Sequence, residues 1–322
     1  MTYSSGSLIV ATDYNGFAND TAGANINSIW ATGTTDAGYG QSALATVAAT
    51  NTITATQWAS LVNTISSIAS HQGTTITART APTAGNIISI LAALNTDLTN
   101  CTTNRGNAIA NGTQYTGWTG TNSVTAGKSG ASWAMTFTNT VTFASANAAR
   151  YFFNAGGRIK IDVAKSSTGN TGDPEWNDLA TTLCGDIYIT GGTATQTIAG
   201  ASYTGTTKTG GTGTPTTLAT TTGWYDLTAG AAATIVYKQF ADTAPYTANY
   251  IQHSIAKGAS SDTLVITSLW QNTDSDPISG GTAPTAATPG TAACTIVTYF
   301  PPSSTYLTTA AWGTPTVAAT VA

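Results

Sequence analysis

The spacing of the apolar residues changes near Gly106, and this change constrains the fold more than any other feature of the sequence. Before Gly106, apolar residues recur every three or four positions, as they do on one face of a helix. After it, alternating apolar runs are separated by Asn-Gly, Thr-Gly and Ser-Gly pairs, which are typical of strands and turns. We therefore expect an α+β chain, with a helical part in residues 1–110 and a mainly antiparallel, sandwich-like or barrel-like β part in residues 111–322.

The clearest predicted helix begins after Thr54, which can cap its N-terminus. Gln57 follows at the spacing of a capping box, and Gly73 stands where a C-cap is expected. A second helix is predicted between Pro82 and Gly106. We expect the apolar stripes of the two helices to be buried, either against each other or against a neighbouring subunit. The candidate packing and oligomerisation residues are Trp58, Leu61, Ile65, Ile90, Leu91 and Leu94.

A less regular helical pattern runs from Thr12 to Trp30. Gly16 and Gly23 interrupt it, and each glycine costs about 1 kcal/mol relative to alanine in a helix interior. Residues 33–41 are expected to form a loop. Together the helices favour a small bundle that serves as an anchoring or oligomerisation domain.

The β part begins with a strand candidate at residues 133–143, whose alternation slips near Asn139. One helix is expected among the strands, capped by Asp173, started by Pro174, and favoured at its positive end by Glu175. The other strand candidates are residues 159–163, 187–189, 224–227, 234–240, 246–256, 263–270 and 294–300.

Two segments of the β part are low in complexity. Residues 191–222 are rich in Thr and Gly, and residues 279–293 consist of Gly, Thr, Ala and Pro with few other types. Neither segment has enough apolar residues to form a core of its own. We expect both to be long surface loops, or arms that become ordered only against a neighbour.

Charged residues make up 7% of the 322 residues, against about 25% in an ordinary soluble domain. Because charges keep free monomers apart and carry acid–base and metal chemistry, this composition favours a structural protein in an assembly over an enzyme. The net charge is −4 and the chain has no basic stripe, so nucleic acid is not an expected partner. The chain also lacks a run of 18 apolar residues, so no membrane partner is expected.

The polar and reactive residues form no recognisable catalytic, cofactor or metal motif. A helix N-terminus accounts for the acidic group of Asp173, Glu175 and Asp178. His71 stands near a helix end, where the dipole favours a charged imidazole, and His253 is placed in a strand. The three cysteines lie far apart and are interpreted as small buried hydrophobic residues: Cys101, Cys184 and Cys294.

The aromatic residues allow two interpretations. Ring faces suit sugar rings, so aromatics near turns and strand ends could bind carbohydrate. The alternative is that these residues pack in the core or in a subunit interface, where large aromatic rings are also favoured. The residues in question are Trp118, Trp224, Tyr225, Trp270 and Trp312.

Several longer motifs resemble uncharacterised virion structural proteins of tailed bacteriophages, especially contractile-tailed phages and cyanophages. The clearest is Ala149-Arg-Tyr-Phe-Phe-Asn-Ala-Gly-Gly-Arg-Ile-Lys-Ile-Asp. Others are Ile9-Val-Ala-Thr-Asp-Tyr-Asn, Gly223-Trp-Tyr-Asp-Leu and Pro301-Pro-Ser-Ser-Thr-Tyr-Leu. The resemblance covers most of the chain. Its motifs are typical of packing and turns, and it implies no catalytic residues.

The resemblance and the composition together predict a non-enzymatic virion component, most simply a tail appendage or its attachment: a fibre, a baseplate-peripheral protein or a collar protein. The alternatives are a capsid decoration protein and a glycan-binding or glycan-depolymerising adhesin. The expected partners are further copies of the chain, with a trimer favoured by analogy with phage fibres, other virion proteins, and a host surface glycan. The start of the chain lacks the basic segment of a signal peptide, so synthesis in the host cytoplasm is expected.

Overall fold

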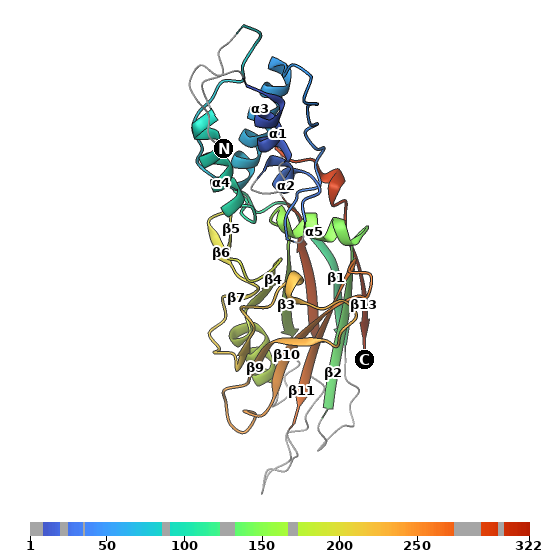
Figure 1. Ribbon diagram of the computed structural model, residues 1–322. Helices are drawn as coiled ribbons and strands as arrows, with labels where there is room; N and C mark the ends of the chain where they lie inside the picture. The colour runs from blue at the N-terminus through green and yellow to red at the C-terminus, as the bar shows by residue number, and fades with distance from the viewer. Residues whose placement is uncertain are drawn as a thin grey trace, which may run out of the picture.

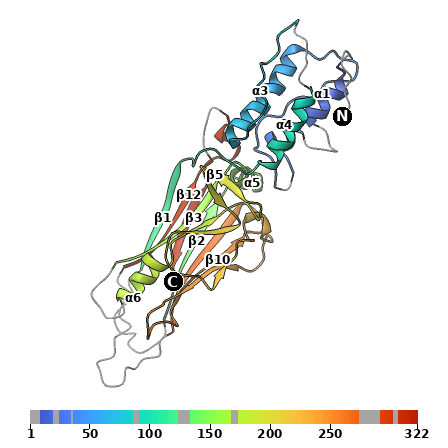
Figure 2. The ribbon, with the colours of Figure 1, turned by 90° about the vertical axis from the view of Figure 1, so that its left-hand side faces the viewer.

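The protein is elongated, with a helical lobe at one end and a β lobe at the other (Figures 1 and 2). The computed structural model describes residues 9–19, 25–34, 36–85, 91–122, 133–166, 173–273, 291–301 and 306–322. The N-terminal helices precede a mainly antiparallel pair of sheets, which confirms the expected α+β class. The C-terminus lies alongside the β lobe (Figure 1).

In the described residues of the helical lobe, four helices pack on one another. Where a single irregular helix was expected, the structure has two: α1 (Ala11–Asn19) and α2 (Ile26–Trp30). The side chain of Asn25 caps α2 by accepting a hydrogen bond from the amide of Ser28 at 2.8 Å. The longer helices are α3 (Ala55–Gln72) and α4 (Leu91–Thr103).

Helix α3 has the boundaries that its capping residues predict. The hydroxyl of Thr54 accepts from the amide of Gln57, and the side chain of Gln57 accepts from the amide of Thr54, which completes the capping box. Gly73 ends the helix in the left-handed conformation, with φ of 71°, where a residue with a Cβ would be strained.

The inner face of α3 fills the helical lobe. The ring of Trp58 lies edge-on to Tyr14 of α1 at 5.8 Å, and Leu61 and Ile65 are fully buried beside it. Truncating Leu61 to alanine is expected to lower the free energy of unfolding by about 2 to 5 kcal/mol, because the vacated space is closed on all sides. Urea denaturation should measure this loss, with Asn63→Ala, an exposed position on the same helix, as the control. A loss below about 0.5 kcal/mol would contradict a packed site.

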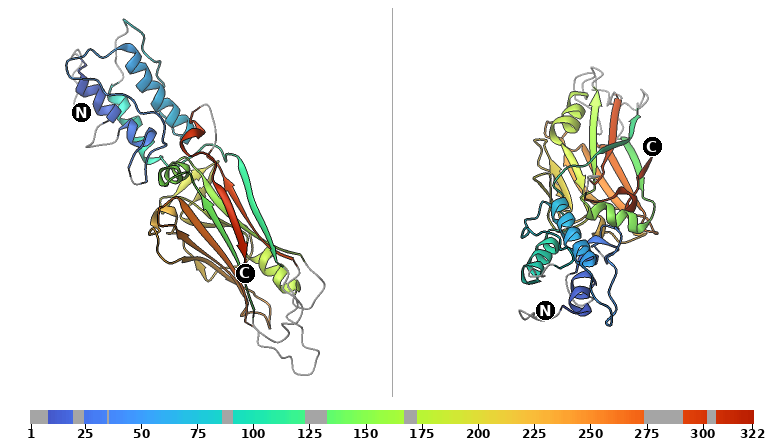
Figure 3. Two further views of the ribbon diagram at one scale, coloured as in Figure 1. Left: turned by 90° about the vertical axis from the view of Figure 1, so that its right-hand side faces the viewer. Right: turned by 90° about the horizontal axis from the view of Figure 1, so that it is seen from above.

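The β lobe is built from two antiparallel sheets that form a sandwich, and neither sheet closes into a barrel (Figure 3). The first sheet has the order β1 (Gln114–Asn122), β12 (Thr291–Tyr299), β3 (Arg158–Ser166), β4 (Asp186–Ile189), β7 (Thr206–Thr209). The second has the order β13 (Thr316–Val321), β2 (Trp133–Thr142), β11 (Thr263–Asn272), β10 (Tyr250–Lys257), β9 (Thr234–Phe240), β8 (Thr217–Leu218).

The alternation of β2 continues without the slip expected near Asn139. Met135, Phe137, Asn139 and Val141 all face the other sheet and are fully buried. Asn139 simply replaces an apolar residue in that series, and its amide donates to the Sγ of Cys294 on β12 at 3.9 Å. The predicted slip in the alternation was wrong, because Asn139 is a polar residue at a buried position of an unbroken pattern.

The segment 191–222 differs from the long loop that its composition suggests. It contains the hairpin β5 (Gln196–Ile198) and β6 (Ala201–Tyr203) and also the strands β7 and β8. Threonine hydroxyls and backbone groups bond to one another along it; for example, Thr206 donates to the carbonyl of Thr222 at 2.8 Å. Backbone hydrogen bonds of this kind need no apolar side chains, so composition alone underestimates the order of the segment. Most of the second low-complexity segment, residues 279–293, lies outside the described residues.

The β5–β6 hairpin lies on the outer face of the first sheet, above Arg158 of β3. The guanidinium of Arg158 is fully buried between the rings of Tyr299, Tyr203 and Tyr188, at 4.6, 4.7 and 5.7 Å from their centroids. It donates one hydrogen bond, of 2.7 Å, to Asn111. No carboxylate among the described residues forms an ion pair with it. Cation–π contacts therefore fasten the hairpin to the sheet, and we refer to this group as the Arg158 cage.

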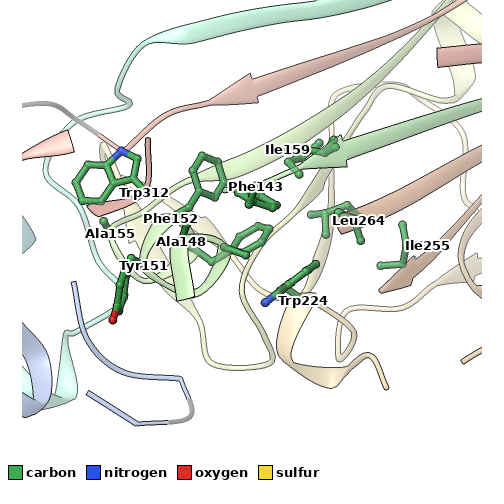
Figure 4. Packing of buried hydrophobic residues seen from close by; sticks show 14 of the residues in the cluster. Phe143, Ala148, Tyr151, Phe152, Ala155, Ile159, Trp224, Ile255, Leu264 and Trp312 are labelled. Carbon is green, nitrogen blue, oxygen red and sulfur yellow. The ribbon is translucent and has the colours of Figure 1, made fainter. Parts of the chain in front are cut away.

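Helix α5 (Ala146–Asn154) lies between β2 and β3 in the chain and bonds to the helical lobe. Arg150 donates to the carbonyl of Thr32 at 2.7 Å, and Asn154 donates to that of Gly38 at 2.9 Å. Phe152 is fully buried, with its ring centroid 5.2 Å from Phe143 and 6.3 Å from Phe300 (Figure 4). After α5 the chain turns sharply at Gly157, where a Cβ would lie 2.5 Å from the carbonyl oxygen of Phe152. One continuous hydrophobic cluster extends from α1 through α5 into the sandwich, so the lobes share a core.

Two other helices differ in how well the sequence predicts them. α6 (Asp173–Asn177) and the π-helical turn η1 (Asp178–Leu183) form the helix expected among the strands. The strand candidate at residues 224–227 is instead a short 3-10 helix, η2 (Trp224–Asp226). The carboxylate of Asp226 accepts a hydrogen bond from the amide of Gly223 at 2.8 Å and so fixes the start of η2. The chain therefore forms a helical turn where its aromatic residues suggest a strand.

Candidate functional site

The predicted packing residues lie in the interior of a single chain wherever their side chains are described. Trp58, Leu61, Ile65 and Leu94 are each no more than 1% exposed. Leu91 begins α4 but its side chain is outside the described residues, and Ile90 lies outside them altogether. The described four contribute to the core of the helical lobe, and the oligomerisation role of the set stays a prediction.

The cysteines are buried in three different places and form no disulfide. Burial raises the pKa of Cys101 and of Cys184 to about 12, so both remain neutral thiols. Burial likewise raises the pKa of Cys294 to about 12. Among the described residues, no group of three or more His, Cys, Asp or Glu side chains is placed to hold a metal ion.

Both histidines are sealed inside the protein. His253 faces the sandwich interior and stacks on Tyr237 at 5.3 Å, and burial lowers its pKa to about 3. His71 does lie in the last turn of α3, but the expected charged imidazole at a helix end is wrong, because burial lowers its pKa to about 4. Neither side chain is accessible to a substrate.

The acidic group near residue 175 contains an additional member that the sequence did not suggest. Glu175 is 8% exposed, and its pKa is raised by burial and by the neighbouring charges of Asp178 and Asp242. Asp242 lies in the segment after β9, far from the helix in sequence. The side chain of Asp173 is outside the described residues, so its capping role stays a prediction.

The aromatic residues singled out from the sequence divide into core residues and one pocket residue. Trp224, Trp270 and Trp312 are at most 3% exposed, which confirms the core interpretation for them. Figure 4 shows Trp224 and Trp312 among the packed side chains. The side chain of Trp118 is outside the described residues. Tyr225 alone among the described members of this group lines a pocket.

That pocket lies where the two lobes meet, and we refer to it as the junction pocket. Its volume is about 540 Å³. Its walls come from the loop before Tyr39, the end of α4, the end of α5, the segment between β4 and β5, and η2. Its lining residues include Asp36, Arg105, Asn154, Gln196, Tyr225 and Asp226.

Two side-chain amides hold the walls of the junction pocket together. Gln196 donates to the carbonyl of Gly106 at 2.9 Å and to that of Phe153 at 3.3 Å. Asn154 donates to the carbonyl of Gly38 at 2.9 Å and accepts from the hydroxyl of Tyr225 at 2.6 Å. These bonds join segments from both lobes, so the pocket is formed without any ligand.

The charged groups of the junction pocket are at its edge. Arg105 donates to Asp36 at 2.9 Å, and their side chains are 34% and 46% exposed. Asp226 is also exposed, while its carboxylate accepts from the amide of Gly223. Burial raises the pKa of Tyr225, so its phenol keeps its proton. Among the described residues, the lining of the pocket contains neither a Cys nor a His.

Sequence reasoning missed this pocket because its residues come from five separate segments. Tyr225 was singled out from the sequence, but only as one of several aromatic residues near turns and strand ends. A signal was present in Gly191-Gly192, because a Cβ at Gly191 would lie 2.8 Å from the ring of Tyr225. That contact becomes visible only when η2 is placed against the end of β4.

No protein-family model, no curated protein and no solved structure matches this chain. Within the described residues, no helix combines the length and the apolar character needed to cross a membrane.

Proposed function

We propose that this protein is a non-enzymatic structural component of a tailed-phage virion, made in the host cytoplasm and located in the tail apparatus as an appendage or its attachment. The observation that carries the proposal is an elongated, two-lobed body in which only 7% of residues are charged. The helical lobe attaches to the particle, and the β lobe projects from it.

The motif with the clearest resemblance to virion proteins supports a structural role. It covers α5 and the start of β3, where Phe152 packs against Phe143 and Phe300 and Gly157 permits a tight turn. Arg158 in the same motif fastens the β5–β6 hairpin. Each of these residues has a packing function, so the motif maintains a shape and contributes no chemistry.

The sparse charge of the surface favours association between copies of the chain. Like-charged surfaces repel, and a net charge of −4 on 322 residues provides little repulsion. Association of identical chains usually produces a closed symmetric oligomer, and we propose a trimer by analogy with phage fibres.

Light scattering and the composition of purified particles test this proposal. At micromolar concentration the isolated protein is expected to have a mass several times 32.6 kDa. Quantitative mass spectrometry of particles is expected to find tens of copies, as for a tail or collar protein. Hundreds of copies would favour the capsid decoration alternative, and a monomer that is absent from particles would contradict the proposal.

A further inference from the structure

We propose that Asn111 is a site of spontaneous chemical modification, at which the side-chain amide is converted to a carboxylate that pairs with Arg158. Gly112 follows Asn111, and glycine has no side chain to hinder the approach of its backbone nitrogen to the asparagine amide. The inference does not depend on the proposed virion function, because it concerns the isolated chain and is tested on it.

The conversion needs water and no other reactant. The backbone nitrogen of Gly112 attacks Cγ of Asn111 and closes a succinimide ring. The amide nitrogen of the side chain takes the proton of the Gly112 N–H and leaves as ammonia. Water then opens the ring at either of its carbonyl carbons, which gives an aspartate or an isoaspartate. A carboxylate is formed in both cases.

The structure leaves Asn111 open to this reaction. Its side chain is exposed, and both Asn111 and Gly112 precede β1 and lie outside the helices and strands. Arg158 donates a hydrogen bond of 2.7 Å to Oδ1 of Asn111. Negative charge develops on this oxygen when the ring closes, so the guanidinium favours the attack.

The product fits the Arg158 cage better than the asparagine does. Nε and Nη1 of Arg158 are buried and have no hydrogen-bond partner within the described ranges. A carboxylate at position 111 replaces a neutral acceptor with a charged one, and charge-assisted hydrogen bonds are about twice as strong. It also supplies the negative charge that this buried guanidinium lacks in the described part of the chain.

A second Asn-Gly pair provides an internal control. Asn15 precedes Gly16 inside α1. Its Oδ1 accepts from the amide of Val47 and its Nδ2 donates to the carbonyl of Val47, both at 2.8 Å. The amide of Gly16 is also part of the helical hydrogen-bond ladder. The same dipeptide is therefore kept from ring closure until α1 opens.

Peptide mapping by mass spectrometry measures both sites in the folded full chain, incubated at mildly alkaline pH. Conversion of Asn111 is expected to be at least about tenfold faster than that of Asn15, because Asn15 reacts only when α1 opens. In concentrated urea, where the fold holds neither pair, the two rates should become similar. Asn111→Gln should abolish conversion at this position, because the longer side chain would have to close a larger ring.

The variant Asn111→Asp tests the pairing with Arg158. It is expected to unfold at a higher urea concentration than the unsubstituted protein, because the carboxylate forms an ion pair with the guanidinium. Asn63→Asp adds the same charge at an exposed position on α3 and should not raise the midpoint. The gain should shrink as the pH falls below about 4, where the carboxyl takes up a proton.

Three outcomes would overturn the proposal. The first is the absence of conversion at Asn111 in the folded protein, and the second is equal conversion of Asn111 and Asn15 there. The third is a urea midpoint of Asn111→Asp no higher than that of Asn63→Asp, which would show that the carboxylate does not pair with Arg158.

Discussion

Acidification from about pH 7 to about pH 4.5 is expected to lower the free energy of unfolding by about 5 kcal/mol, because two buried imidazoles resist protonation in the folded protein. Burial lowers the pKa of His71 from 6.5 to about 4 and that of His253 from 6.5 to about 3. In the unfolded chain both groups take up protons below pH 6.5, while the folded chain does not. The stability present above pH 6.5 is therefore lost as the pH falls toward the folded pKa values.

Urea denaturation at a series of pH values, followed by tryptophan fluorescence, measures this dependence. His253→Phe keeps a ring against Tyr237 but cannot titrate, so it should remove about half of the pH dependence. Glu175 cannot substitute for the histidines, because its raised pKa favours the folded state as the pH falls. An unchanged pH dependence in the His253→Phe variant would contradict the prediction.

Replacing Phe152 with alanine is expected to cost about 5 kcal/mol, at the upper end of the range for aromatic residues in a core. The side chain is fully buried and meets Phe143, Phe153 and Phe300, with ring centroids 5.1 to 6.3 Å apart. Aromatic pairs add to the loss beyond the buried area. Because α5 bonds to the helical lobe through Arg150 and Asn154, the variant should also weaken the coupling between the lobes.

Far-ultraviolet and near-ultraviolet circular dichroism during urea denaturation measure both effects. The unsubstituted protein is expected to give coincident transitions, since its lobes share one hydrophobic core. Phe152→Leu should lose less stability than Phe152→Ala, and Asn147→Ala, on the exposed side of α5, should change little. Separate transitions already present in the unsubstituted protein would show that the lobes unfold independently.

Features that depend on neighbouring residues could be predicted from the sequence. Helix α3 begins and ends at its capping residues because Thr54, Gln57 and Gly73 act within one turn of each boundary. The helix at residues 173–183 and the strands of the sandwich follow from local periodicity in the same way. The fold class could be predicted because the apolar spacing changes once along the chain, from helical periodicity to strand alternation.

Features that depend on distant residues could not be predicted. The aromatic segment at residues 224–227 forms a short 3-10 helix in which Trp224 is buried in the protein core, against Phe143 and Phe153. His71 was expected to be a charged residue at a helix end, but the structure buries it beside Tyr39, with the two ring centroids 5.3 Å apart. The junction pocket is formed by five segments that are far apart in the sequence. No motif or residue spacing in the sequence predicts that these segments lie close together.

The Arg158 cage has a consequence for the behaviour of the protein in acid. The cation–π contacts of the cage involve neither a histidine nor a carboxylate, and burial raises the pKa of Tyr188. The Arg158 cage should therefore hold the β5–β6 hairpin equally well in acid, while protonation of the buried histidines destabilises the protein core. Gln196, the first residue of that hairpin, forms part of the pocket wall. As the pH falls, the wall should hold its shape until the whole chain unfolds.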